Sequence, residues 1–324
     1  MTPYRAMPRF IATIALMVSF AAPMASADEP IHFGKSLATL FHYTPIDVGL
    51  DRGIFKSHGI DVDVTSFDGD AKLQQALASG SIDMGVGGGP SLAFIAKGTP
   101  ALAVAQEAGA PLGATLTVLY DSAIKTPNDL KGKTTSVSTV GSQPEWMTRE
   151  LSRQQGWGPD GINLVALGGV PSQVAALKTR QTDAFVADIT TAYRLEDSRE
   201  GRILVKFGDV IPNYINTVMY ASNRMMADHP DKLRSFLTAW FETVAFMKKN
   251  KTDTVRIVSG VLKIPDTIVG RVYDETFRMI SEDGKFDPKG LAVLSRSFVE
   301  MAMLPTEPDT SKLYTEKFLP VISR

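Results

Sequence analysis

The sequence predicts an α/β protein built from two similar lobes, with the chain crossing between them twice. Segments with strand periodicity alternate with helix-length segments, which is typical of a parallel or mixed sheet. A helix-to-strand pattern also recurs one hundred residues downstream, and strand-like segments at 116–120 and 216–221 stand where a chain could leave one lobe and return. We therefore expect a discontinuous lobe I, residues 28–116 and 218–324, a lobe II, residues 117–217, and a cleft between them.

The first 27 residues have the pattern of a secretory signal peptide. Arg5 and Arg9 flank the start of an apolar run at 10–20 that is too short to span a bilayer, and residues 25–27, Ala-Ser-Ala, form a small-residue cleavage site. An uncut membrane anchor is the alternative. We expect cleavage after Ala27, no membrane insertion afterwards and a periplasmic location.

Composition excludes several classes of protein. The chain has no cysteine, so disulfides, thiolate metal sites, a cysteine nucleophile and a lipidated cysteine anchor are excluded. Its 34 Lys and Arg residues balance 35 Asp and Glu residues, which gives no indication of a nucleic-acid partner. A hydrophobic content of 44% is enough for a packed core.

The first lobe begins with short elements separated by glycine-rich turns. In chain order we expect a strand at 31–34, an amphipathic segment at 39–55, a strand at 60–64, a helix at 70–78, a strand at 82–86 and a turn at 87–89 into another helix. Residues 176–186 echo 76–86 at four positions, although generic βαβ patterning could produce the same matches. From Pro230 onward the sequence predicts mainly helices, including 233–247 and one that begins at Pro265.

Three polar turns feed predicted helix starts and are candidate ligand sites. They are 68–70 with Gly69, 87–91 with Gly88, and 138–142 with Ser138, Thr139, Gly141 and Ser142. Backbone N–H groups at a helix start are free to bind an anion, and glycine lets a ligand approach the main chain. Ordinary helix capping is the alternative for each turn taken alone.

Aromatic and carboxylate side chains near these turns complete the candidate cleft. His42, Tyr43 and Trp146 could form the walls of a small-molecule site, with core packing as the alternative. Asp188 follows an apolar strand, where it could read a polar group of a ligand or cap the next helix.

Catalytic and metal-binding patterns are missing from the sequence. The four histidines form no H-x-x-x-H pair, and the nucleophile elbow G-x-S-x-G does not occur. We expect no catalytic residue, no metal ion and no cofactor.

Several motifs resemble the periplasmic substrate-binding proteins of ABC importers, in the group of nitrate, aliphatic sulfonate, taurine and pyrimidine-precursor (Thi5/NMT1-like) binders. These motifs are Thr44-Pro45-Ile46, Gly53-Ile54-Phe55, Gly59-Ile60-Asp61-Val62, Leu77 to Asp83, Asp129 to Lys133, Gly141-Ser142 and Asn223 to Phe236. The resemblance covers the whole chain after the signal peptide. It implies the type II periplasmic-binding-protein fold with two crossover hinge strands, and closure around the ligand by a hinge motion.

The resemblance also implies contact positions at His42, Tyr43, Gly69, Gly88, Gly141 and Ser142. Residues 187–190 depart from the Trp-Asp-Pro or Trp-Glu-Pro of many sulfonate and nitrate binders, and the absence of cysteine excludes the related pyrimidine synthase.

The function expected from these observations is the capture of a small organic solute with an anionic end. The N–H groups of Gly141 and Ser142 would hold the anion, Trp146 and Tyr43 would sandwich the body, and Asp188 with His42 would read a polar tail. The partners would be an ABC permease with its ATPase, and the protein would be a monomer. The alternatives are an aromatic or pyrimidine ligand, a membrane sensor as partner, or an enzymatic role.

Overall fold

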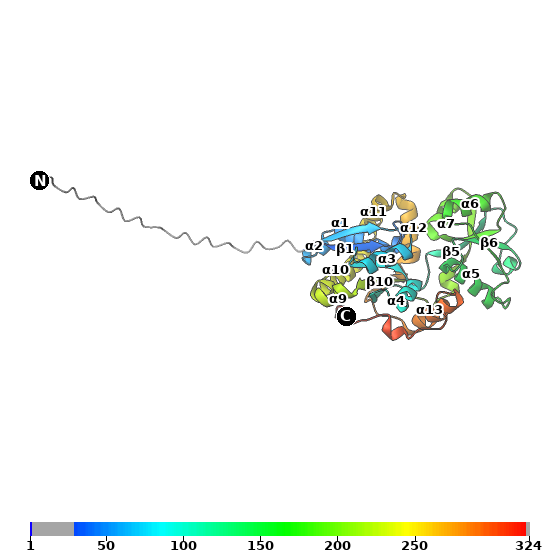
Figure 1. The fold of residues 1–324 in the computed structure, drawn as a ribbon. Coiled ribbons are helices and arrows are strands. Elements are labelled where there is room, and N and C mark those ends of the chain that lie inside the picture. Colours follow the sequence, from blue (N-terminus) through cyan, green and yellow to red (C-terminus); the bar gives the residue numbers. More distant parts are fainter. Residues whose placement is uncertain (2–28, 322–324) are drawn as a thin grey trace.

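The computed structural model describes residues 29–321 together with Met1, so the predicted signal peptide lies outside the described residues apart from Met1. The described chain forms two mixed sheets of five strands, each flanked by helices. The sheets form two lobes that lie side by side (Figure 1). The predicted α/β class and two-lobe arrangement are therefore confirmed.

The first sheet combines strands from the start of the described chain with one strand that follows the second lobe. Its members are β1 (Ile31–Lys35), β2 (Val62–Ser66), β3 (Met84–Gly88), β4 (Ala101–Ala108) and β10 (Thr217–Ser222). They lie in the order β2-β1-β3-β10-β4, and β10 runs antiparallel to both of its neighbours. We call the body built on this sheet the first lobe.

The second sheet repeats that arrangement with strands from the middle of the chain. Its members are β5 (Ala114–Leu119), β6 (Thr134–Val137), β7 (Asn163–Ala166), β8 (Ala184–Asp188) and β9 (Gly201–Lys206). They lie in the order β7-β6-β8-β5-β9, and β5 runs antiparallel to both of its neighbours. We call the body built on this sheet the second lobe.

The sequence echo is a structural repeat. The Asp83 carboxylate accepts a hydrogen bond of 3.0 Å from the backbone N–H of His32, which lies on β1. The Asp183 carboxylate accepts one of 2.9 Å from the backbone N–H of Thr134, which lies on β6. In both lobes this aspartate leads into the third parallel strand and ties it to the strand beside it.

The chain passes between the lobes through two connecting segments, 109–113 and 207–216. The two strands predicted at the crossings are found at 114–119 and 217–222, but each lies wholly within one sheet. The crossings are therefore the segments between strands. The exact lobe boundaries stay a prediction.

Helices cover the faces of both sheets. In the first lobe these are η1 (Phe41–Tyr43), α1 (Pro45–Asp51), α2 (Ile54–Ser57), α3 (Asp70–Ser79), η2 (Gly89–Ser91) and α4 (Leu92–Ala96). In the second lobe they are η3 (Pro127–Leu130), α5 (Gln143–Gln154), α6 (Val170–Lys178), α7 (Ile189–Asp197) and α8 (Phe207–Val210). After β10 come α9 (Asn223–Asp228), α10 (Pro230–Lys249), α11 (Lys251–Leu262), α12 (Asp266–Thr276), η4 (Phe277–Met279), α13 (Pro288–Glu300) and η5 (Thr310–Lys312).

Two expectations about the first lobe need correction. The amphipathic segment predicted at 39–55 is divided into η1, α1 and α2, and Gly53 between the last two has a left-handed backbone with φ 68°. The strand predicted at 82–86 starts and ends two residues later, because Gly87 and Gly88 pair with β10 and extend the sheet.

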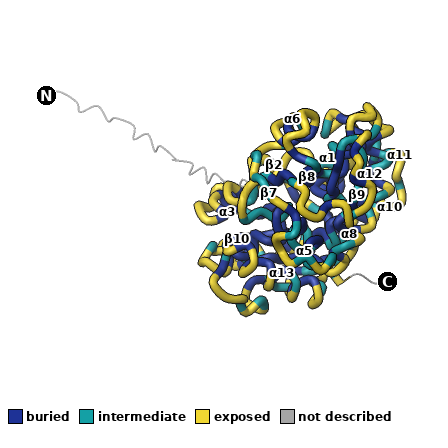
Figure 2. Tube along the Cα trace, turned by 90° about the vertical axis from the view of Figure 1, so that its right-hand side faces the viewer, coloured by how far each residue is buried: buried dark blue, intermediate teal, exposed yellow. Residues whose placement is uncertain are grey.

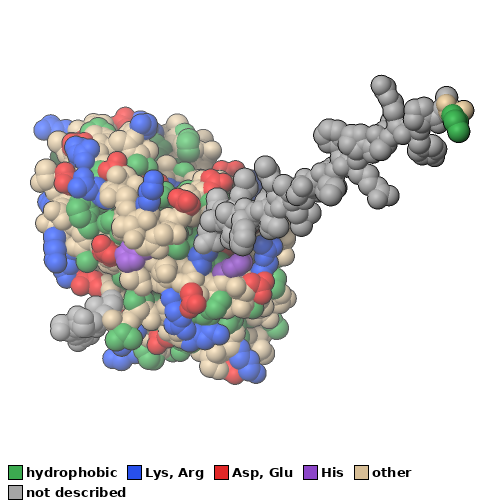
Figure 3. Space-filling view, turned by 90° about the vertical axis from the view of Figure 1, so that its left-hand side faces the viewer, with side chains coloured by type: hydrophobic (Ala, Val, Ile, Leu, Met, Phe, Trp, Pro, Cys, Tyr) green, Lys and Arg blue, Asp and Glu red, His purple; other side chains and the backbone are tan. Residues whose placement is uncertain are grey.

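The hydrophobic core lies between the sheets and the helices that cover them. Phe33 of β1 stacks on Phe236 of α10 at a ring-centroid distance of 5.3 Å, and Trp240 joins them. Buried residues follow the strands and the inner sides of the helices, while exposed residues lie on the outer turns (Figure 2). Basic and acidic side chains are interspersed on the face shown in Figure 3.

Candidate functional site

One edge of the first sheet turns its strand ends toward the second lobe. β3 and β1 are parallel, and β10 is antiparallel to both β3 and β4. The ends of β1, β3 and β4 therefore meet the start of β10 at a single edge, beside the two crossing segments. In α/β proteins, ligands bind at the carboxyl ends of the parallel strands.

Hydrogen-bonded polar groups occupy this edge. The Tyr43 hydroxyl lies 3.0 Å from the Ser36 hydroxyl, directly after β1. The backbone N–H of Gly88, at the end of β3, donates to an Asp70 carboxylate oxygen at 2.9 Å. The Gly88 carbonyl accepts a 2.8 Å hydrogen bond from the Tyr220 hydroxyl. Helix α3, strand β3 and strand β10 are thus held together at the point that faces the cleft.

Glu107 adds a second carboxyl to the same edge, near the end of β4. It is 1% exposed, and neither of its carboxylate oxygens has a hydrogen-bond partner among residues 29–321. Burial holds the pKa of Glu107 well above its usual range. We call Ser36, Tyr43, Asp70, Glu107 and Tyr220 the edge cluster.

Burial also shifts the pKa values of the other members of the edge cluster. The pKa of Asp70 is raised by loss of hydration, although the hydrogen bond from Gly88 opposes that rise. The pKa of Tyr43 lies well above its usual value, first because the phenol is buried and then because Asp70 and Glu107 add negative charge. Both carboxyls therefore act on one phenol, which places them around a common point.

His42 lies next to this cluster and is buried. Its ring centroid is 4.7 Å from that of Tyr43, and within the described chain its Nε2 has no hydrogen-bond partner. Burial lowers the pKa of His42 to about 4, so the ring is neutral at neutral pH. A neutral imidazole has one donor and one acceptor nitrogen, and the buried Nε2 has no described partner for either role.

The loop before α5 differs from the anion site predicted there. The Gly141 N–H donates to a Glu145 carboxylate oxygen at 2.7 Å, and the other oxygen of that carboxylate accepts from Arg149 at 2.9 Å. Since the chain supplies its own carboxylate, this N–H is not free for an external anion in this structure. The Ser142 hydroxyl is buried and unpaired with any described residue.

Two other predicted ligand positions, Ser138 and Gly69, form backbone hydrogen bonds within the chain. Ser138 accepts the Gly168 N–H through its carbonyl at 3.0 Å, and Thr139 is exposed. Gly69 has φ 117°, a conformation that favours glycine, and its N–H donates to the Ser36 carbonyl at 2.8 Å. Gly69 thus shapes the turn that brings Asp70 to the edge cluster.

Trp146 is buried and does not line an open ligand site. It is 1% exposed, its ring stacks on Tyr214 at 5.2 Å, and its indole N–H donates to Glu300 at 2.5 Å. The predicted sandwich of a ligand between Trp146 and Tyr43 is corrected accordingly, because the chain's own Tyr214 covers the Trp146 ring.

Asp188 caps helix α7. Its carboxylate accepts from the Thr191 N–H at 3.1 Å and from the Thr191 hydroxyl at 2.6 Å. Of the two interpretations of Asp188, the structure shows the cap, in which each carboxylate oxygen already accepts a hydrogen bond.

Side-chain contacts join the lobes on two sides, where α12 lies beside α7 and α13 lies beside α5 (Figure 1). On α12, Arg271 pairs with Glu196 at 2.8 Å and with Asp197 at 2.7 Å, and its guanidinium lies 3.8 Å from the Tyr193 ring centroid. On α13, Glu300 receives the Trp146 indole N–H. The described structure is therefore a form in which the two lobes are in contact.

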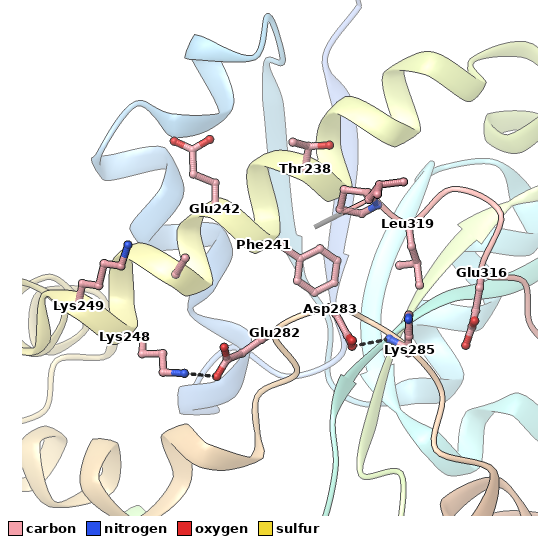
Figure 4. Close-up of a pocket in the computed structure, with 13 residues that line it drawn as sticks. Thr238, Phe241, Glu242, Lys248, Lys249, Glu282, Asp283, Lys285, Glu316 and Leu319 are labelled. Atoms are coloured by element: carbon pink, nitrogen blue, oxygen red, sulfur yellow. Dashed lines mark hydrogen bonds and ion pairs between the residues drawn. The ribbon is translucent and has the colours of Figure 1, made fainter. Parts of the chain in front are cut away.

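Two cavities among the described residues lie away from the edge cluster. One of about 1610 Å³ opens beside α10, where Figure 4 shows Phe241 and Leu319 with the Lys248–Glu282 ion pair. Another of about 450 Å³ lies at the crossing segments, lined by Gly109, Leu112 and Pro212 among others. Neither is lined by a member of the edge cluster.

Sequence reasoning missed Glu107, Ser36 and Tyr220, and it assigned Asp70 only to a helix start. A signal for Glu107 was present, because a carboxylate beside Gln106 near the end of the mainly apolar segment 101–108 is unusual. Across the described part of the chain, no three His, Asp or Glu side chains gather as metal ligands. Nor does any helix in that part combine the length and apolar character that a membrane crossing requires.

The two sheets, their two crossings and the polar edge between them define the class of protein. It is a two-lobe α/β protein with the periplasmic-binding-protein fold. A family model described as NMT1/THI5 like matches residues 41–253, and the chain belongs to this family.

Relatives and solved structures agree with this assignment. A protein of Brucella abortus strain 2308 named "Putative binding protein" is 24% identical over 260 residues, which cover 79% of each chain. The aliphatic sulphonate binding protein SsuA of Escherichia coli superimposes with a TM-score of 0.77 at 18% identity, over 89% of this chain and 92% of its own. The desulfurization enzyme DszB superimposes with a TM-score of 0.66 at 14% identity, over 89% of this chain and 97% of its own. The fold is thus shared by binding proteins and an enzyme.

Proposed function

We propose that this protein is the solute-binding component of an ABC importer. It would be exported to the periplasm, lose residues 1–27, and bind a small organic solute between its lobes as a monomer. It would then present the closed form to an inner-membrane permease driven by a cytoplasmic ATPase.

The observation that carries this proposal is the edge cluster together with His42. Polar side chains that are buried usually have hydrogen-bond partners, and a group left without one lowers stability. Glu107 and the Nε2 of His42 have none among the described residues. Glu107 lies near the end of β4, and His42 lies in η1 with its ring against Tyr43 of the edge cluster. Groups of this kind are expected where a ligand supplies the missing hydrogen bonds.

Similarity to other proteins supports the same class of function. SsuA proteins share the fold, and one from Xanthomonas axonopodis is described as bound to MOPS, with a TM-score of 0.72 at 17% identity, over 88% of this chain and 98% of its own. At such identities the likeness concerns the fold, so the solute of this chain has to be found from its own residues.

The proposal can be tested by purifying the protein from the periplasm of an expressing bacterium. Mass spectrometry of the intact chain should show an N-terminus at Asp28. Small molecules released on denaturation should include one that raises the melting temperature when it is added back to the emptied protein. A protein that carries no solute and responds to none of the candidate compounds would contradict solute binding.

Two other roles remain for comparison. A membrane sensor could read the closed form as a permease would, and deletion of the neighbouring transport genes would then leave the response to the solute intact. An enzymatic role, favoured by the likeness to DszB, requires that the bound solute be converted on incubation with the purified protein.

A further inference from the structure

The chemical class of the solute can be inferred from the charges in the edge cluster, and this inference rests on the proposed function. Glu107 is almost completely buried, and no described side chain or backbone group pairs with its carboxyl. Asp70 contributes a second carboxyl that accepts one hydrogen bond from Gly88. A buried carboxyl without a cationic or donor partner is unfavourable, so its presence requires an explanation.

The chain provides no cation to neutralise these carboxyls. Lys35 ends β1 beside Ser36, but its ammonium group bonds to Asp47 at 2.9 Å. Burial raises the pKa values of Asp70 and Glu107, hydrogen bonds oppose the rise at Asp70, and no Lys, Arg or protonated His of the described chain contributes to either. A bound ligand is therefore the available source of the complementary group.

At the anion site predicted in the second lobe, a carboxylate of the chain accepts the Gly141 N–H, and the Ser142 hydroxyl has no partner among the described residues. At the start of α5, Glu145 already accepts the Gly141 N–H and forms an ion pair with Arg149. Gln143 reaches toward the first lobe and donates to Asn216 at 3.0 Å. An anionic ligand at the edge cluster would meet the carboxyls of Asp70 and Glu107, with no described cation contributing to either.

We propose that the cleft binds a ligand through a protonated nitrogen or an amino group, held by Glu107 and Asp70, and that it rejects sulfonates and carboxylates at this position. A ligand cation would favour the ionised forms of both carboxyls, and charge-assisted N–H···O bonds are among the strongest hydrogen bonds in proteins. The solute is therefore proposed to have a cationic or amino end in place of the anionic end expected from the sequence.

A set of four ring compounds of nearly the same shape provides the test. Benzamidine carries a cationic amidine, benzamide a neutral amide, and benzoate and benzenesulfonate an anion. Titrations at millimolar concentration should show that benzamidine raises the melting temperature of the full mature protein, that benzamide has a smaller effect, and that the two anions have none.

Substitution of Glu107 makes the test specific to the site. Glu107→Gln keeps the size of the side chain and removes its charge, so we expect benzamidine to bind about tenfold more weakly or worse. The melting temperature of the empty variant should stay close to that of the parent, because the amide of Gln is as buried and unpartnered as the carboxyl that it replaces. Glu282→Gln is a matched control on an exposed glutamate, where both measurements should stay unchanged.

The outcomes separate this inference from the proposed function. Binding of benzoate or benzenesulfonate in preference to benzamidine would overturn the inference and leave solute binding intact. Binding of benzamidine with equal affinity to parent and Glu107→Gln would also overturn it. If no compound binds and Glu107→Gln is less stable than the parent, Glu107 is a structural residue and the inference is wrong. A periplasmic preparation that holds no solute would instead contradict the proposed function.

Discussion

The two lobes share one arrangement of strands but treat their carboxylates differently. In the first lobe the Asp70 carboxylate accepts a hydrogen bond from the N–H of Gly88. The equivalent residue of the second lobe is Val170, which has no carboxylate. At the end of the third strand, Gly88 corresponds to Asp188, which bonds to Thr191 of its own helix. The second lobe thus satisfies its carboxylate locally, and the first lobe directs one toward the cleft.

This difference indicates a division of labour between the lobes. Both lobes contain buried polar groups without a partner among the described residues, but the unpartnered carboxyl, Glu107, and the unpartnered imidazole nitrogen, the Nε2 of His42, lie in the first lobe. The second lobe contributes aromatic packing and ion pairs that hold the two bodies together. Substitutions in the second lobe should therefore affect stability first, and substitutions in the edge cluster should affect binding first.

The largest expected effect is at Trp146. Trp146→Ala should lower the free energy of unfolding by about 3–5 kcal/mol, because it empties a fully buried site and removes the stack on Tyr214. Tyr43→Phe, which removes only a hydroxyl in the first lobe, should cost about 1 kcal/mol and weaken solute binding. Chemical denaturation of both variants measures the difference, and equal losses of stability would remove the proposed contrast.

The second-largest expected effect is the loss of stability at acid pH that His42 causes. Burial lowers the pKa of His42 to about 4 from 6.5, so the unfolded chain binds more protons than the folded protein between these values. His42 therefore lowers stability as the pH falls from 6.5 through 4, by roughly 3 kcal/mol over this window. Asp70 and Glu107, whose pKa values are raised, act in the opposite direction on acidification.

A His42→Gln variant isolates this effect. Denaturation at pH 7 and pH 4.5 should show a smaller loss of stability on acidification than in the parent, because the variant has no imidazole to protonate, while the carboxyls contribute equally to both proteins. The same loss in both proteins would show that His42 is not held neutral by burial.

The smallest effect compares two equivalent helix ends. Gly80 after α3 and Arg180 after α6 both have a left-handed backbone, with φ 75° and 59°. Gly80→Ala should lower stability by about 1 kcal/mol, since the added Cβ meets no atom and only backbone strain acts. Arg180→Gly should raise stability by about 0.5 kcal/mol, because relief of strain is partly offset by a more flexible unfolded chain and the loss of the exposed pair with Asp121. Thermal unfolding of the pair checks the sign of each change.

Sequence by itself determined the class of fold, because that class depends on local periodicity. Alternating strand and helix lengths, and Asp83 and Asp183 at matching points of a repeat, follow from residues close together in the chain. The cap formed by Asp188 is local as well, since it joins residues three apart, and it was one of the two interpretations offered for this residue.

Tertiary structure decided the composition of the candidate site. Whether the Gly141 N–H is free depends on the rotamer of Glu145, and the place of Trp146 depends on Glu300, which is 154 residues away. The edge cluster joins the ends of β1, β3 and β4 only because the sheet order brings them together. The sequence shows only that Glu107 lies near the end of a mainly apolar segment, and the packed sheet shows that its carboxyl is buried near Tyr43 without a partner in the described chain.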